Sequence, residues 1–153
     1  PTAPPSAKPT PSPTPTPTPT PLCPPSPIDT DYTALGGAGS FLGAPLGGDT
    51  AIADGGKFRD FANGTIYLAP GATAAFALQK DLATYWKTLG AGTSAIGYPV
   101  GDSVADANGD GGWSANFAGG KAWWAPATGG GNCTNTLCFI IVHPSLKIFL
   151  PNP

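Results

Sequence analysis

Glutamate and methionine are absent from this chain of 153 residues, histidine occurs once, and charged residues make up only 10%. With seven basic residues and a net charge of −2, the chain lacks the Lys/Arg clusters that bind nucleic acids or anionic membranes. No run of 18 apolar residues occurs, so we expect no membrane-spanning helix. One His and no Glu leave few groups for acid–base catalysis, and neither a Gly-x-Ser-x-Gly elbow nor a phosphate loop is present. We therefore expect no enzyme activity, no cofactor and no nucleic-acid partner.

Proline and glycine are abundant, and they occupy different parts of the chain. Thirteen of the 20 prolines lie in residues 1–27, and all 22 glycines lie between Gly36 and Gly131. This segregation predicts a Pro/Thr-rich stalk or linker at 1–27, a compact domain at 28–131 and an apolar tail at 132–153. The chain starts without a Met or a signal peptide, which is typical of a processed product.

The N-terminal arm alternates Thr and Pro, which favours an extended polyproline II conformation. Such a composition is expected to carry O-linked sugars, here on Thr14, Thr16, Thr18 and Thr20. The arm is then either a spacer or a glycosylated stalk that itself packs in a wall or fibre. Two tripeptides, starting at Asn63 and Asn132, also fit the N-glycosylation pattern.

Residues 31–130 contain an internal repeat. Leu42-Gly43-Ala44-Pro45 recurs as Ile96-Gly97-Tyr98-Pro99, 54 residues later, and Asp54-Gly55-Gly56 recurs as Asp110-Gly111-Gly112, 56 residues later. The change of offset predicts a two-residue insertion between Pro99 and Asp110. Two copies of one unit therefore account for the compact domain.

Each unit is expected to contain a β-hairpin and a helix. Residues 57–62 and 65–68 flank Asn63-Gly64, a strong signal for a two-residue turn with positive φ, and Gly119-Gly120 holds the same place in the second copy. Residues 73–89 show a helical apolar stripe, with Thr73 as the expected cap and Gly90 in the left-handed position beyond the end. In the first copy only residues 28–34 precede Leu35, so that helix is short or missing.

These motifs resemble the LGFP repeat family. The residues that carry the resemblance are Trp86-Lys87-Thr88-Leu89-Gly90, Leu42-Gly43-Ala44-Pro45 and Phe61-Ala62-Asn63-Gly64-Thr65-Ile66-Tyr67. The resemblance implies an α+β, mostly β fold made of hairpin-plus-helix repeats in a propeller-like module. It also implies an extracellular protein that is not catalytic and that attaches to cell-wall polysaccharide.

Aromatic side chains are the candidate sugar contacts, because aromatic faces stack on sugar rings. Trp86 lies on the predicted helix and is expected in the core. Trp123 and Trp124 are neighbours on a strand and must point to opposite faces. Trp123 aligns with Tyr67 and is expected to be buried, which leaves Trp124, with Trp113 and Tyr98, as the carbohydrate-binding residues.

Three cysteines suit an oxidising, secreted setting. Cys133 and Cys138 are expected to pair with each other, with Cys23 as the alternative partner of one of them.

The segment from Asp106 to Gly111 matches half of a calcium loop through Asp106, Asn108 and Asp110. Its bidentate carboxylate is missing, so a plain turn is the stronger interpretation and we expect no metal site.

The tail contains two apolar runs, residues 139–142 and 146–150, separated by His143-Pro144-Ser145. Both runs favour β-strands that must be buried, either in this domain or in a neighbouring subunit. The lone His143 is expected to be structural.

Taken together, the sequence predicts a secreted, non-enzymatic adhesion module that binds cell-wall or matrix polysaccharide. The alternative is a subunit of an extracellular fibre that assembles through the Pro-rich arm and the apolar C-terminal strands.

Overall fold

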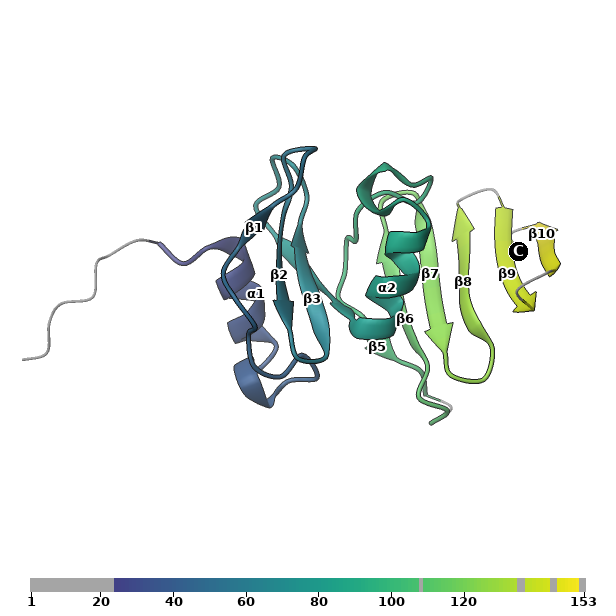
Figure 1. The fold of residues 1–153 in the computed structure, drawn as a ribbon, viewed down its shortest axis with the longest axis horizontal. Helices are drawn as coiled ribbons and strands as arrows, with labels where there is room; N and C mark the ends of the chain where they lie inside the picture. The colour runs from purple at the N-terminus through teal and green to yellow at the C-terminus, as the bar shows by residue number, and fades with distance from the viewer. Residues whose placement is uncertain (1–23, 108, 135–136, 144–145, 152–153) are drawn as a thin grey trace, which may run out of the picture.

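The computed structural model describes residues 24–107, 109–134, 137–143 and 146–151, and for the last two segments it describes the backbone only. This part of the chain is mostly β with two α-helices. Figure 1 shows α1, a first sheet, α2 and a second sheet following one another along the molecule. Residues 1–23 of the predicted arm, with its four threonines and Cys23, lie outside the described residues, whereas Ser26 and Pro27 at its end cap and begin α1.

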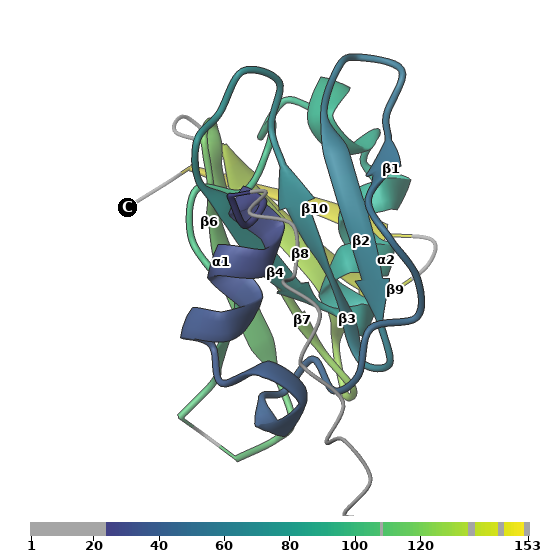
Figure 2. The same cartoon turned by 90° about the vertical axis from the view of Figure 1, so that its left-hand side faces the viewer.

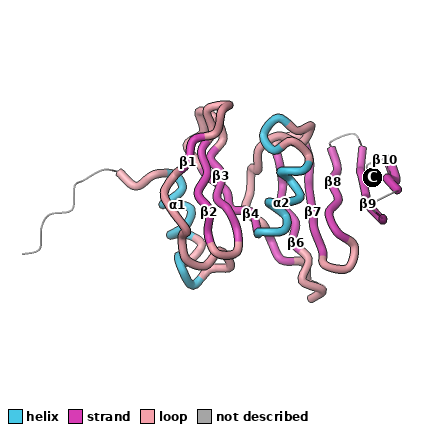
Figure 3. The backbone as a smooth tube through the Cα atoms, viewed as in Figure 1, coloured by secondary structure: helices cyan, strands magenta, loops and turns pink. Residues whose placement is uncertain are grey.

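Figure 3 shows where the helices and strands lie along the chain. The first unit contains α1 (Pro27–Ala34), β1 (Thr50–Ala51), β2 (Lys57–Phe61), β3 (Gly64–Leu68) and β4 (Ala75–Gln79). The second contains α2 (Lys80–Thr88), β5 (Val104–Ala105), β6 (Trp113–Phe117), β7 (Gly120–Ala125) and β8 (Gly129–Thr134), and it is followed by β9 (Leu137–His143) and β10 (Leu146–Pro151). Two antiparallel sheets result, with the orders β1-β2-β3-β4 and β10-β9-β8-β7-β6-β5.

The two units repeat each other in detail. The Tyr32 hydroxyl donates to the Gly43 carbonyl at 3.0 Å, and 54 residues later the Trp86 indole nitrogen donates to the Gly97 carbonyl at 2.9 Å. Gly36 and Gly90, just past the two helices, have φ of 103° and 104°, which favours glycine. The predicted repeat and the predicted left-handed Gly90 are therefore confirmed. The short first helix is also confirmed, as α1 has eight residues.

The predicted helix over residues 73–89 is wrong in its first half. Residues 75–79 form β4, which pairs with β3, and α2 begins only at Lys80. Ala75 and Ala77 lie on the face of β4 that packs against the first core. The segment therefore forms a strand paired with β3, although its apolar residues are spaced as in a helix. The N-cap is Gln79, whose side chain accepts from the amides of Asp81 and Leu82, in place of Thr73.

The predicted Asn63-Gly64 turn is displaced by one residue. Phe61 pairs with Gly64, so the turn consists of Ala62 and Asn63, and neither has positive φ. Both turn amides are used, because Ala62 donates to the Ala44 carbonyl and Asn63 to the Leu42 carbonyl. Gly64 is needed for space: a Cβ there would lie 2.5 Å from the Leu78 carbonyl oxygen and 2.6 Å from the Leu42 side chain. Its counterpart Gly120 faces the Cys133 carbonyl in the same way.

Helix α1 covers one face of the first sheet, as the end-on view in Figure 2 shows. Ile28, Leu42, Phe61 and Ile66 form the core beneath it. Arg59 fixes the helix to the sheet through Asp29, and it also pairs with Asp49 in the following loop; both N–O distances are 2.6 Å. The opposite face of this sheet joins a larger core with α2 and the second sheet.

A segment of the second unit covers the outer edge of β4. The Asp102 carboxylate accepts from the Ala77 amide at 2.8 Å, and the Ser103 hydroxyl accepts from the Gln79 amide at 2.7 Å. The Ser103 amide in turn donates to the Ala77 carbonyl. An exposed strand edge is a site for unwanted pairing, so these bonds both protect β4 and attach unit two to unit one.

The two apolar runs of the tail form β9 and β10, as predicted. They extend the second sheet of their own chain, since β9 pairs with β8 and β10 pairs with β9. Of the two predicted alternatives, this domain or a neighbouring subunit, the backbone therefore shows pairing within the same chain. In the described part of the chain, no helix has the length and apolar character needed to cross a membrane.

We predict that Gly64→Ala lowers the free energy of unfolding by about 1–3 kcal/mol, because the new methyl group overlaps the Leu78 carbonyl and the Leu42 side chain. Gly47→Ala is the matched control, since nothing lies within 4 Å of its Cβ position; we expect it to change stability by less than about 0.5 kcal/mol. Urea unfolding measures both. Equal effects of the two substitutions would show that close packing at Gly64 is not required.

A second prediction concerns Asp31 on α1, whose Oδ2 is buried without a partner among the described residues. Burial, followed by the nearby Asp102 carboxylate, raises the pKa of Asp31 from 3.8 to about 7. The folded chain therefore holds a proton that the unfolded chain releases, so stability falls as the pH rises from about 4 through 7. Asp31→Asn should leave stability unchanged at pH 4 and increase it at pH 8. Urea unfolding at the two pH values tests this, and an equal effect at both would contradict it.

Candidate functional site

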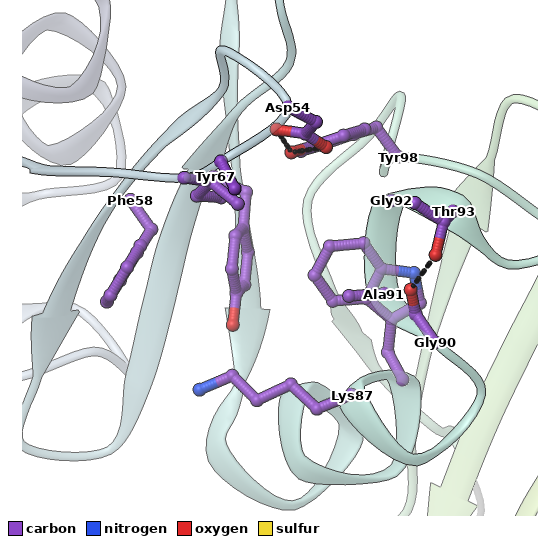
Figure 4. A pocket seen from close by; sticks show the side chains of 12 residues that line it. Asp54, Phe58, Tyr67, Lys87, Gly90, Ala91, Gly92, Thr93 and Tyr98 are labelled. Atoms are coloured by element: carbon purple, nitrogen blue, oxygen red, sulfur yellow. Dashed lines mark hydrogen bonds between the residues drawn. The ribbon is translucent and has the colours of Figure 1, made fainter.

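A pocket of about 290 Å³ lies at the junction of the two units. One wall comes from β2, β3 and the loop before them, and the other from α2 and the residues that follow it (Figure 4). Its lining is mainly aromatic and apolar, with one carboxylate and one ammonium group. The lining residues are Ile52, Ala53, Asp54, Phe58, Tyr67, Trp86, Lys87, Gly90, Ala91, Gly92, Thr93 and Tyr98.

Trp86 forms the base of the pocket and is 1% exposed. It lies next to Tyr85 among the buried residues of α2, so the prediction that this residue belongs to the core is confirmed. Its ring meets Tyr67 of the first sheet edge-on at 4.7 Å and Phe117 of the second sheet at 5.9 Å between ring centres. Because the indole nitrogen is bound to the Gly97 carbonyl, the ring has a fixed position.

Tyr98 closes the upper side of the pocket and binds across the junction. Its hydroxyl donates to the Asp54 carboxylate, with distances of 2.8 and 3.0 Å to the two oxygens. Burial and the Asp54 carboxylate raise the pKa of Tyr98 to about 12. Bonds from the Gly56 amide and from Tyr98 lower the pKa of Asp54, which is therefore ionised at neutral pH. A Cβ at Gly92 would overlap the Tyr98 ring, so a glycine is required there.

Tyr67 and Lys87 occupy the other side of the pocket. The Tyr67 side chain is 3% exposed, and its hydroxyl has no hydrogen-bond partner among the described residues. Burial is the largest cause that raises the pKa of Tyr67, so the phenol is neutral. In Figure 4 the Tyr67 hydroxyl points to the side of the pocket where the Lys87 side chain ends. The Lys87 ammonium lies 5.9 Å from the centre of the Phe58 ring, within range of a cation–π contact.

The pocket depends on residues in which the two copies differ. Phe58 corresponds to Ser114, and Tyr98 corresponds to Ala44. One sequence signal could have identified Phe58. It is an aromatic residue, at a position facing the junction, that only one of the two copies carries. The sequence predicted Tyr98 as a ligand contact and the Tyr67 position as buried, but the roles of Phe58, Lys87 and Asp54 were missed.

The other two predicted sugar contacts, Trp113 and Trp124, lie away from this pocket. They stand opposite each other on β6 and β7, and both pack against the larger core. The assignment of Trp123 as buried and Trp124 as exposed is therefore wrong. Tyr67 is buried because α2 covers it, whereas Trp123 faces away from α2 and is half-buried against Gly131. Sugar binding by Trp113 and Trp124 stays a prediction.

The two N-glycosylation sites differ in access. Asn63 is exposed at the first hairpin turn. Asn132 is 7% exposed, and its side-chain oxygen accepts from the Tyr85 hydroxyl at 2.8 Å, so a sugar there would displace a buried bond. Glycosylation at either position stays a prediction.

Cys133 is disulfide-bonded, and the ladder places Cys138 directly opposite it. Because the side chains of β9 lie outside the described part, the Cys133–Cys138 pairing stays a prediction.

The half calcium loop lies between β5 and β6, where the second unit has its extra residues. Asp110 accepts from the Gly112 amide at 2.8 Å, just as Asp54 accepts from Gly56 at 3.0 Å in the first unit. Asn108 lies outside the described residues. Among the residues that are described, no three His, Cys, Asp or Glu side chains gather as metal ligands.

Comparison with known proteins identifies the repeat. The family model described as LGFP repeat matches residues 42–94 and again residues 96–135, together more than half of the chain. A comparison with curated proteins found no match. The boundary between the two matched segments falls just before Ile96, where the second Leu-Gly-x-Pro-like loop begins. The chain therefore belongs to the LGFP repeat family and carries two copies of its repeat.

Proposed function

We propose that this protein is a secreted, non-enzymatic module that binds polysaccharide of a cell wall or extracellular matrix in the pocket between its two repeats. The observation that carries the proposal is the group of aromatic rings at this junction. Phe58, Tyr67 and Tyr98 come from both units; Trp86 packs against Tyr67 and Tyr98, and Tyr67 packs against Phe58. Rigid aromatic faces with few polar groups beside them are typical of ligand pockets.

The polar groups of the pocket suit the hydroxyls of a sugar. The ionised Asp54 can accept hydrogen bonds, and Lys87 and the unpartnered Tyr67 hydroxyl can donate them. Most of the binding surface is positioned before a ligand arrives, because Tyr98 is bound to Asp54 and Trp86 to Gly97. A pre-organised site loses little entropy on binding.

Membership of the LGFP family supports the extracellular location, and so does the disulfide at Cys133. The non-enzymatic assignment rests on the sequence, which has a single His, no Glu and no recognisable nucleophile–base set. Binding requires no cofactor or metal.

We predict that Phe58→Ser and Tyr98→Ala each weaken glycan binding at least about tenfold, since stacking on one aromatic ring contributes on the order of 1–3 kcal/mol. Both substitutions introduce the residue that the other copy carries at the same position, Ser114 and Ala44. Because Phe58 and Tyr98 also pack against the larger core, the melting temperature of each variant checks that the fold is kept. Calorimetric titration of the full chain with soluble neutral and acidic wall oligosaccharides is the measurement.

The control is Trp123→Tyr, which places the residue of the first copy on the sheet face away from the pocket. It should leave binding unchanged. If Trp123→Tyr abolishes binding while Phe58→Ser and Tyr98→Ala retain it, the site is on the outer face of the second sheet and the junction pocket is excluded.

Fibre assembly is the second candidate function, and one observation favours it. Strand β10 ends the larger sheet, and among the described strands none pairs with its outer edge. An open edge can accept a strand from another chain, and a head-to-tail contact of this kind produces filaments.

If the protein assembles in this way, its sedimentation coefficient should rise with concentration, and deletion of residues 139–153 should yield a species that stays monomeric. Analytical ultracentrifugation of the two chains measures this. A full-length chain that sediments as a monomer at every concentration would refute fibre assembly without affecting glycan binding.

A further inference from the structure

The junction carries more hydrogen-bond donors than acceptors. A second hollow of about 230 Å³ adjoins the aromatic pocket, and Lys87 lines both of them. The second hollow is polar and includes Asp60, Thr65 and Lys80. Together the two hollows form one groove along the face between the first sheet and α2, with an aromatic half and a polar half.

Both carboxylates in this groove already have donors. Asp54 accepts from the Tyr98 hydroxyl and the Gly56 amide, and Asp60 accepts from the Thr65 hydroxyl at 2.7 Å. Neither acid forms an ion pair with a basic side chain in the described part of the chain, where the ion pairs are those of Arg59.

The basic groups, in contrast, have no acidic partner among the described residues. Lys80 and Lys87 lie seven residues apart on α2, hence on the same side of the helix; neither takes part in an ion pair among the described residues. Tyr67 lines the aromatic half, and its buried hydroxyl has no well-aligned hydrogen bond among the described residues, although the Thr65 hydroxyl and the Asp60 carboxylate act on its pKa. A buried hydroxyl without such a bond is costly, so it favours a bound group that completes the site.

We propose that the glycan bound at this junction carries a carboxylate, and that the carboxylate binds the Tyr67 hydroxyl and the Lys87 ammonium while the sugar ring stacks in the aromatic half. The inference rests on the proposed glycan binding and specifies its substrate class. Uronic acids and lactyl-substituted amino sugars both provide this chemistry. Lys80, further along the groove, would meet the next acidic group of an extended chain.

Calorimetric titration of the full-length protein with an oligogalacturonide, with its carboxyl-reduced neutral counterpart and with a muramic-acid-containing oligosaccharide tests the proposal. At least one acidic glycan should bind about tenfold more tightly than the neutral one, since a charge-assisted hydrogen bond contributes on the order of 1.5–3 kcal/mol. Its affinity should fall as salt is added. Comparison of the oligogalacturonide with the muramic-acid-containing oligosaccharide shows which of the two kinds of carboxylate the site binds.

Two variants locate the carboxylate. Lys87→Gln should weaken binding of the acidic glycan about tenfold more than binding of the neutral one, whereas Lys121→Gln, the same charge change on the exposed outer side of β7, should affect neither. Tyr67→Phe should weaken binding of the acidic glycan more than binding of the neutral one. An unchanged melting temperature of this variant separates a binding role from a structural one.

The outcomes separate the two proposals. Equal binding of acidic and neutral glycans by the unmodified protein overturns the carboxylate proposal and leaves glycan binding intact. A preference for acidic glycans that survives both Lys87→Gln and Tyr67→Phe also overturns it, because the acid would then bind elsewhere. Failure of every glycan to bind overturns the proposed function and this inference together.

Discussion

Trp86 is the contact on which the arrangement of the two units depends. Its ring lies between the first sheet and the second, touching Tyr67 on one side and Phe117 on the other, and its nitrogen fixes the loop at Gly97. In the first unit Tyr32 makes the equivalent contacts with Phe61 and Gly43. Each helix therefore attaches to its own sheet through one aromatic ring. Helix α2 also packs against the sheet of the first unit. A tryptophan is large enough to fill both interfaces.

The candidate site exists because the two copies are not identical. Residues that hold a helix against the sheet of its own unit are of the same type in both copies, as Phe61 and Phe117 are. Positions that face the next unit differ: Phe58 and Tyr67 meet α2, whereas Ser114 and Trp123 meet no further helix among the described residues. Lys121 likewise stands where the first unit has the buried Thr65. At these positions the outer face of the second sheet is thus more polar than the corresponding face of the first.

The sequence was sufficient to predict the two units, their hairpins, the left-handed glycine after α2 and the two C-terminal strands, because each has a local signal. It was insufficient for β4, where Ala75 and Ala77 look helical and only pairing with β3 makes them a strand. It also misplaced the hairpin turn, because the need for glycine at Gly64 comes from Leu42 and Leu78, which are distant in sequence. Of the candidate site, only Tyr98 was predicted as a ligand contact. Asp54, Phe58 and Lys87 come close to Tyr98 only when the two units pack together.

Because the pocket is assembled from the sheet of one unit and the helix of the next, sites are counted by junctions and not by repeats. If the pocket binds glycan as proposed, the junction between the two repeats provides one site, and each repeat added in series would contribute another at a fixed spacing. Retention on a surface that repeats the same sugar would then grow steeply with the number of linked sites. On this proposal the number of linked repeats sets the avidity, even when every pocket has the same affinity.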